Sequence, residues 1–152
     1  MKKLFLILPV FLLTCTVFAQ QFVTSTYVER TSVSPKTGVS IGTVNRYGME
    51  FGGFYQESKL IESTLMSERS LEALPRMYEQ VFYGAYFACP LLYSRISEVR
   101  LNIRTGVVNG ESFVITPSVL GRYKFNQTLS VGAGVGVRAF RPTFQTKISI
   151  TI

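Results

Sequence analysis

The stretch EVRLNIRTGVV, residues 98–108, alternates between two kinds of side chain. Its odd positions, from Val99 to Val107, carry no charge, whereas Glu98, Arg100 and Arg104 stand at even positions. A period of two is the repeat of a β-strand, in which successive side chains point to opposite faces. The stretch therefore predicts a strand whose two faces meet different surroundings.

The same repeat continues to the end of the chain, where three more strands are expected at 112–125, 128–139 and 142–152. If Asn109-Gly110-Glu111 forms a three-residue turn, Val108 faces Ser112 and Glu98 faces Arg122. The final hairpin then brings Lys147 beside Gly134 or Gly136.

Upstream, weaker patterns indicate strands near 22–33, 39–45, 47–58 and 78–89, with a turn at Ser34–Gly38 and a connection at 90–97. The pattern leaves open whether 39–57 is one strand or two. With two, the total is eight, and an even number suits a closed single-chain barrel.

Composition excludes several function classes. The 152 residues allow one domain, and the formal net charge of +7 is spread over single basic residues on alternate positions, which does not favour nucleic acid as a partner. The chain has no His, which removes Ser-His-Asp and Cys-His catalysis and the commonest metal ligand. We therefore expect no catalytic residue, no metal site and no cofactor.

Residues 1–19 predict a cleaved secretory signal peptide: Lys2 and Lys3 precede an apolar core, and Ala19 suits the position before the cut. The mature domain would be 20–152. Two alternatives stay open, an acylated Cys15 in a lipoprotein signal and an uncleaved anchor. No later stretch approaches 18 continuous apolar residues, so no transmembrane helix is expected after the signal.

Alternation alone does not tell which face is wet, because a soluble lipocalin-type barrel is apolar inside and a membrane barrel is apolar outside. Glycines at 132, 134 and 136 lie on the polar face, where in a crowded lumen the missing side chains would make room for long ones opposite. The apolar face of the last four strands carries no charge, as hydrocarbon demands. We therefore predict a polar network with a structural role in the lumen, made of Glu50, Glu98, Arg100, Arg104, Arg122, Arg138 and Lys147.

The segment 59–77 has no period of two and is the longest expected loop. If the C-terminus is periplasmic, alternation of the strands places this loop on the outside of the cell. It is either a plain polar loop or a surface that contacts a partner.

The motifs VGAGVGVR (131–138) and FQTKISITI (144–152), after a signal peptide and six further candidate strands, resemble the small OmpA/OmpX-like barrels of Gram-negative bacteria. The resemblance covers 21–152 and implies an all-β fold, an eight-stranded antiparallel up-and-down transmembrane β-barrel in the cell outer membrane. It also implies insertion by the barrel-assembly machinery, with outer-membrane lipid and lipopolysaccharide as neighbours. The chain ends in Ile152, where the family typically ends in an aromatic residue.

The leading hypothesis is a non-enzymatic outer-membrane barrel with a filled polar lumen and a structural or surface-interaction role. The alternative is a soluble periplasmic lipocalin-like barrel that binds an apolar ligand, with its apolar side chains inside. A lipid-modifying enzyme is disfavoured because no His is available to activate Ser or Thr. An aqueous porin is disfavoured because eight strands enclose too little space.

Overall fold

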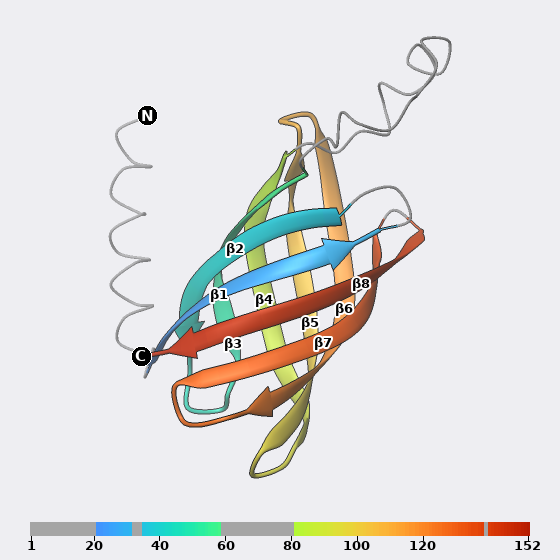
Figure 1. The fold of residues 1–152 in the computed structure, drawn as a ribbon. Coiled ribbons are helices and arrows are strands. Elements are labelled where there is room, and N and C mark those ends of the chain that lie inside the picture. The colour runs from blue at the N-terminus through green and yellow to red at the C-terminus, as the bar shows by residue number, and fades with distance from the viewer. Residues whose placement is uncertain (1–20, 32–34, 59–80, 139) are drawn as a thin grey trace, which may run out of the picture.

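A computed structural model describes residues 21–31, 35–58, 81–138 and 140–152. The predicted signal peptide (1–19) and the predicted surface loop (59–77) lie outside these residues. Figure 1 shows the strands, which run in the order β1 (Gln21–Arg30), β2 (Pro35–Val44), β3 (Glu50–Glu57), β4 (Val81–Tyr93), β5 (Ser97–Val108), β6 (Ser112–Lys124), β7 (Leu129–Arg138) and β8 (Arg141–Thr151).

The eight strands form a closed barrel in which each strand pairs antiparallel with the next, and β8 pairs with β1. Closure leaves no sheet edge with unpaired backbone groups, which is the condition for a β-structure in hydrocarbon. Phe22 and Ile152 exchange backbone hydrogen bonds of 2.8 Å, so both ends of the barrel sequence lie together. Among the described residues, no helix is both long enough and apolar enough to cross a membrane.

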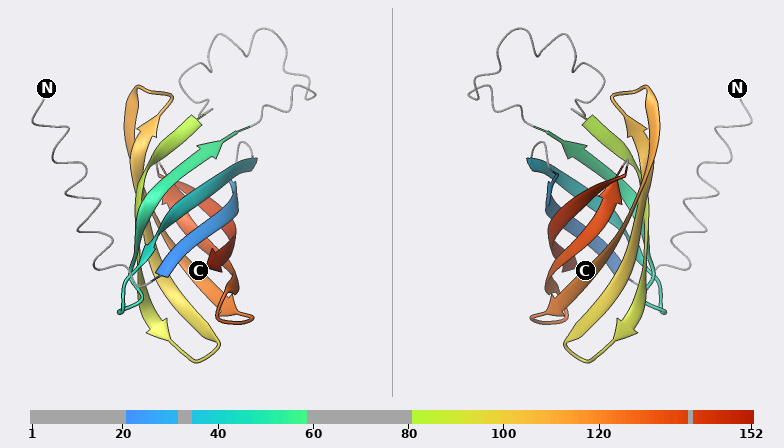
Figure 2. Two further views of the ribbon diagram at one scale, coloured as in Figure 1. Left: turned by 90° about the vertical axis from the view of Figure 1, so that its left-hand side faces the viewer. Right: turned by 90° about the vertical axis from the view of Figure 1, so that its right-hand side faces the viewer.

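The barrel has two ends, which we call the terminal end and the loop end. The terminal end holds Phe22, Ile152 and the β2–β3, β4–β5 and β6–β7 turns, and the loop end holds the β5–β6 turn and the end of β3. Figure 2 shows strands that tilt strongly against the barrel axis, and a β4–β5 hairpin that extends beyond the other turns at the terminal end.

The segment 39–57 forms two strands, which answers the question that the sequence pattern left open. The turn between β2 and β3 is held by Asn45, whose side-chain oxygen accepts hydrogen bonds from the backbone N–H groups of Tyr47 (2.9 Å) and Met49 (3.0 Å). An Asn side chain that caps its own turn in this way stabilises the chain reversal. Gly48 completes the turn with a φ of 78°.

The predicted register of the β5–β6 hairpin is confirmed. Val108 pairs with Ser112, and Glu98 pairs with Arg122. Asn109 (φ 52°) and Gly110 (φ 77°) adopt the left-handed conformation that such a tight turn requires. The last hairpin differs by one step from the prediction, since Lys147 pairs with Gly132 rather than Gly134 or Gly136.

Two predictions that rested on prolines were wrong, because both prolines lie in strands. Pro35 opens β2 rather than a turn, a position where a strand tolerates the missing N–H. Pro90 lies inside β4, which continues to Tyr93, and the β4–β5 register shifts between Pro90 and Leu92. A bulge absorbs a proline within a strand, so the expected connection at 90–97 shortens to 94–96.

The two faces of the barrel are opposite in polarity. On the outer wall, Ile148 is 50% exposed and Val131 is 37% exposed. Inside the barrel, Arg104 is only 2% exposed. Over the fully described strands β5 to β8, charged residues alternate with these apolar positions and point inward. The apolar side chains inside are few, and Phe54, Phe82, Tyr86 and Val108 form one cluster.

Glycines on the inner face serve close packing. A Cβ added to Gly134 would lie 2.1 Å from the Val119 carbonyl oxygen of the neighbouring strand, closer than any side chain allows. Gly42 and Gly52 pair across β2 and β3, and the Tyr86 ring covers both of them. Missing side chains therefore let strands approach and make room for long side chains, as the polar-face glycines predicted.

Candidate functional site

Most of the charged side chains inside the described barrel form two groups joined by ion pairs. The terminal cluster lies toward the terminal end and consists of Glu50, Glu98, Arg100, Arg122, Lys124 and Lys147. The loop cluster lies toward the loop end and consists of Glu29, Gln56, Arg104 and Arg138. Each residue stands at an inward position of its strand, as the period of two requires.

Glu98 collects three cations in the terminal cluster. Its carboxylate lies 2.8 Å from Arg100, 3.0 Å from Arg122 and 3.1 Å from Lys124. Arg122 faces Glu98 directly across the β5–β6 pair, which is why the hairpin register decides this contact. The Glu98 side chain is only 3% exposed, so these charge-assisted contacts replace its hydration.

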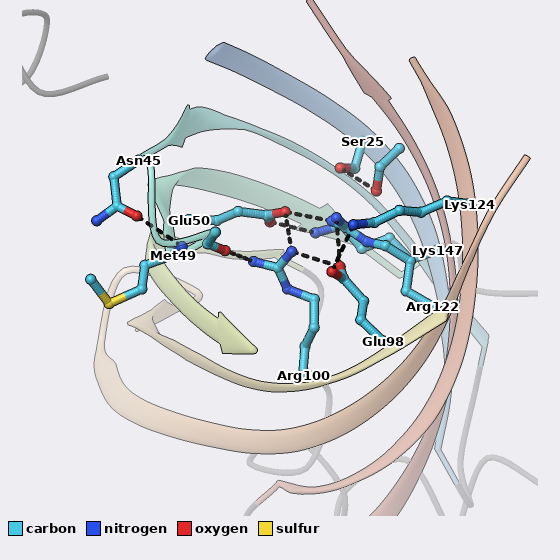
Figure 3. Close-up of polar contacts among 11 residues, drawn as sticks. Ser25, Asn45, Met49, Glu50, Glu98, Arg100, Arg122, Lys124 and Lys147 are labelled. Atoms are coloured by element: carbon cyan, nitrogen blue, oxygen red, sulfur yellow. Dashed lines mark hydrogen bonds and ion pairs between the residues drawn. The ribbon is translucent and has the colours of Figure 1, made fainter. Parts of the chain in front are cut away.

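Glu50 is the second carboxylate of this cluster (Figure 3). It forms ion pairs with Arg122, with Arg100 at 3.1 Å and with Lys147 at 3.7 Å. Arg100 also donates a hydrogen bond of 2.6 Å to the carbonyl oxygen of Gly48. The cluster thereby ties the β2–β3 turn to strands β5, β6 and β8 across the lumen.

The loop cluster is built around one carboxylate. Arg104 lies 2.9 Å from Glu29 and Arg138 lies 3.7 Å from it, while Gln56 donates a hydrogen bond of 2.9 Å to the same oxygen, Oε2. The Gln56 carbonyl oxygen in turn accepts from Arg104 at 3.2 Å and from Arg138 at 3.3 Å. All four residues are buried to 2% exposure or less. The amide therefore bridges two guanidinium groups that share one anion.

Aromatic rings contact the cations of both clusters. The Arg138 guanidinium lies 4.0 Å from the Phe82 ring centre, and Arg104 lies 5.0 Å from that of Tyr27. In the terminal cluster, the Lys147 ammonium lies 5.2 Å from the centre of the Tyr86 ring. A cation over a ring face gains electrostatic attraction where water is excluded.

Small polar groups also lie in the lumen, some of them beside the terminal cluster. Ser25 donates to Ser149 at 2.9 Å, joining β1 to β8. A cavity of about 20 Å³ is bordered by Glu50, Arg100, Asn102 and Ser149, among others. Such a space suits one water molecule with several polar partners.

All seven residues predicted for a lumen network point inward, and the structure distributes them over both clusters. Arg104 and Arg138 belong to the loop cluster, and the other five belong to the terminal cluster: Glu50, Glu98, Arg100, Arg122 and Lys147. Sequence reasoning missed Glu29 and Gln56. Glu29 continues the inward series of Ser25 and Tyr27 on β1, but the hydroxyl-rich strand offers too little polarity contrast to reveal its faces.

Cations outnumber carboxylates in both clusters. The terminal cluster has two carboxylates against four cations, and the loop cluster has one against two, so the formal charges are +2 and +1. Among the described residues, no three of His, Cys, Asp and Glu come together in a way that could hold a metal ion. The arrangement can neutralise buried charge, and each of its carboxylates is engaged in doing so.

The orientation of the side chains is the reverse of that in a soluble ligand-binding barrel. The lipocalin-like alternative predicts apolar side chains around a central pocket, but the central positions here hold Glu29, Glu50 and Arg104 at 2% exposure or less. Their burial inside and the apolar outer wall are the arrangement of a membrane barrel.

Comparison with solved structures gives the same fold. The chain is similar to a structure described as "De novo design of transmembrane beta-barrels", with a TM-score of 0.66, 8% sequence identity, and coverage of 88% of this chain and 97% of that one. It also matches the crystal structure of Neisserial surface protein A (NspA), with a TM-score of 0.41, 12% identity, and coverage of 87% and 94%. No family model and no curated protein matches the sequence. The chain therefore has the fold of an eight-stranded transmembrane β-barrel.

Proposed function

We propose that the chain is a non-enzymatic outer-membrane protein of a Gram-negative bacterium, with a filled polar lumen and a structural or surface-interaction role. The observation that carries the proposal is the inverted polarity of the barrel: Glu29 and Glu50 are fully buried inside, while residues such as Ile41 (65% exposed) and Val135 (62% exposed) form the outer wall. Exposure of this apolar wall is favourable in hydrocarbon and unfavourable in water.

The ion pairs support a plug rather than a pore. The terminal cluster joins β3, β5, β6 and β8 across the lumen, and the loop cluster joins β1, β3, β5 and β7. Because the interior of an eight-stranded barrel is just wide enough for side chains to fill, two such layers favour a closed lumen. In this role the predicted network residues stabilise the barrel by joining its strands across the lumen.

The absence of His from the sequence and the engagement of the buried carboxylates in ion pairs support a non-enzymatic role. A general acid or base needs a proton that it can exchange with a substrate. Glu29, Glu50 and Glu98 are instead held by guanidinium groups inside the barrel.

The proposal includes partners. Insertion would use the barrel-assembly machinery, outer-membrane lipid and lipopolysaccharide would surround the wall, and the segment 59–77 would offer the surface for a partner outside the cell. Position supports this last point, because β3 ends and β4 begins at the end of the barrel opposite Phe22 and Ile152.

Membrane fractionation combined with electrophoresis of boiled and unboiled samples tests the proposal. A folded outer-membrane barrel pellets with the outer membrane and changes its mobility when heated. Recovery in the soluble periplasmic fraction, with no such change, would contradict the proposal.

A further inference from the structure

The outer wall carries a groove of about 650 Å³ at the terminal end. Its floor is the pair Gly121 and Ala133, which face each other across β6 and β7. Val99 and Val131 border it along the wall, and residues of the β4–β5 hairpin such as Tyr93 also line it. Figure 2 shows that this hairpin projects beyond the other turns at the terminal end. The groove therefore runs from the apolar wall to the tip of the hairpin.

The packing of the barrel does not require this groove. A Cβ added to Gly121 would meet only the Ala133 carbonyl oxygen, at 3.8 Å, which is ordinary van der Waals contact. This differs from Gly134 on the inner face, where a Cβ would clash with the neighbouring strand. A larger residue at 121 would point outward and fill the groove without disturbing the fold.

The charges beside the groove are mainly positive. Glu98 also lines it, but this buried carboxylate is held by Arg100, Arg122 and Lys124. Among the described residues, the charges with some exposure at the terminal end are cations, on Arg46, Arg95, Arg122 and Lys124, whereas the exposed carboxylates, on Glu57 and Glu111, belong to the loop end. Arg95 is exposed in the β4–β5 turn, next to the groove residue Ser94. The Lys124 ammonium lies 4.5 Å from the centre of the Tyr93 ring.

We propose that this groove binds one molecule of an anionic phospholipid. An acyl chain lies over Gly121 and Ala133, and the phosphate lies at the hairpin tip, near Arg95 and Ser94. Tyrosine rings at a membrane interface suit this depth, since they have an apolar body and a polar tip. The proposal rests on the barrel spanning a bilayer, as proposed above.

A phospholipid fits this surface better than a second copy of the chain does. Two copies joined through this groove by twofold symmetry would bring the same cationic rims together, which is unfavourable because like charges repel each other. A headgroup phosphate instead supplies the negative charge that the rim lacks, while its acyl chain occupies the apolar floor.

Native mass spectrometry tests the proposal on the full chain extracted from membranes in a mild detergent. Phosphatidylglycerol and phosphatidylcholine with identical acyl chains are added in parallel, and inorganic phosphate is added in a third arm. We expect one phosphatidylglycerol per barrel to persist at detergent concentrations that remove phosphatidylcholine, with no adduct from inorganic phosphate alone.

Two matched pairs of variants locate the site. Gly121→Leu fills the groove and is expected to abolish the retained lipid, while Gly53→Leu enlarges the other outward glycine that faces an alanine, Ala85, and is expected to leave it unchanged. Arg95→Gln is expected to lower the affinity about fivefold. Arg46→Gln removes the same charge from the β2–β3 turn, away from the groove, and is expected to have no such effect.

The heat-dependent mobility shift of each variant shows whether its barrel is folded, so a failure of the membrane proposal is seen separately. In folded protein, equal retention of the two phospholipids would overturn the lipid site. So would equal effects of Gly121→Leu and Gly53→Leu, because they would indicate unspecific lipid around the barrel. An adduct with inorganic phosphate alone would show a simple anion site instead and would also overturn it.

Discussion

Both charged clusters of the lumen neutralise buried charges, but they differ in the number of carboxylates available to do so. In the terminal cluster, two carboxylates serve four cations, and Arg100 and Arg122 each contact both carboxylates. In the loop cluster, Glu29 is the one carboxylate among four residues and contacts both Arg104 and Arg138, and a neutral amide supplies a further acceptor. Among the ion pairs of the described residues, those of the terminal cluster are therefore more redundant than those of the loop cluster.

The difference teaches that the number of charges inside a barrel does not measure the importance of each one. Removing a partner from a buried pair leaves a charge without compensation, which costs more than the pair itself contributes. Where another carboxylate is within reach, that cost falls. The largest effects are therefore expected at Glu29, although the terminal cluster holds more charge.

Glu29→Gln should give the largest loss. The substitution keeps the size of the side chain but removes the carboxylate that Arg104 and Arg138 share, at a cost of about 3–5 kcal/mol. Urea unfolding of the barrel reconstituted in lipid vesicles measures the change. An effect below about 1 kcal/mol would contradict this expectation and indicate that another anion compensates the two guanidinium groups.

Glu98→Gln should cost less, about 1–3 kcal/mol. Arg100 and Arg122 keep their contacts with Glu50, and the Lys124 side chain is 28% exposed and can turn to water. The same unfolding experiment ranks the two variants. The redundancy argument fails if Glu98→Gln destabilises the barrel more than Glu29→Gln does.

Lys147→Met should change the stability by no more than about 1 kcal/mol. The terminal cluster has more cations than carboxylates, and Lys147 is its most distant member, 3.7 Å from Glu50. Methionine keeps most of the apolar contact with the Tyr86 ring while removing a buried charge, a change that is often neutral. Arg104→Met is the matched variant in the loop cluster, and its expected loss of about 3 kcal/mol or more provides the contrast.

Lys124→Gln should have the smallest effect, below about 1 kcal/mol, because a partly exposed ion pair is screened by water and salt. Its contribution should also decrease as salt is added, while that of Glu29 should not. Unfolding curves at low and high salt separate the two cases. A strong salt dependence at Glu29 would indicate that water reaches the loop cluster.

The sequence predicts contacts between neighbouring strands better than contacts across the lumen. The period of two and the Asn109-Gly110 turn place Glu98 opposite Arg122, and the structure has this pair. Those rules are local, since a turn sets the register of the two strands that it joins.

The contact between Glu29 and Arg104 lies beyond such rules. It joins β1 to β5, which are not neighbours in the barrel, and it depends on the tilt of the strands and on how the barrel closes. The role of Gln56 cannot be read from the local sequence, because its hydrogen-bond partners lie on β1, β5 and β7. The bulge after Pro90 also escapes prediction, since a proline indicates a turn as readily as it indicates a bulge.

The orientation of the outer wall is the central claim, and a spin label at one position tests it most directly. Cys89 is a free cysteine, so it is first replaced by serine. Ile148→Cys is then labelled and the barrel is inserted into lipid vesicles. The account predicts frequent collisions of the label with oxygen, which concentrates in hydrocarbon, and few with a water-soluble nickel complex. Free access of the nickel complex and little contact with oxygen would place this side chain in water and contradict the account.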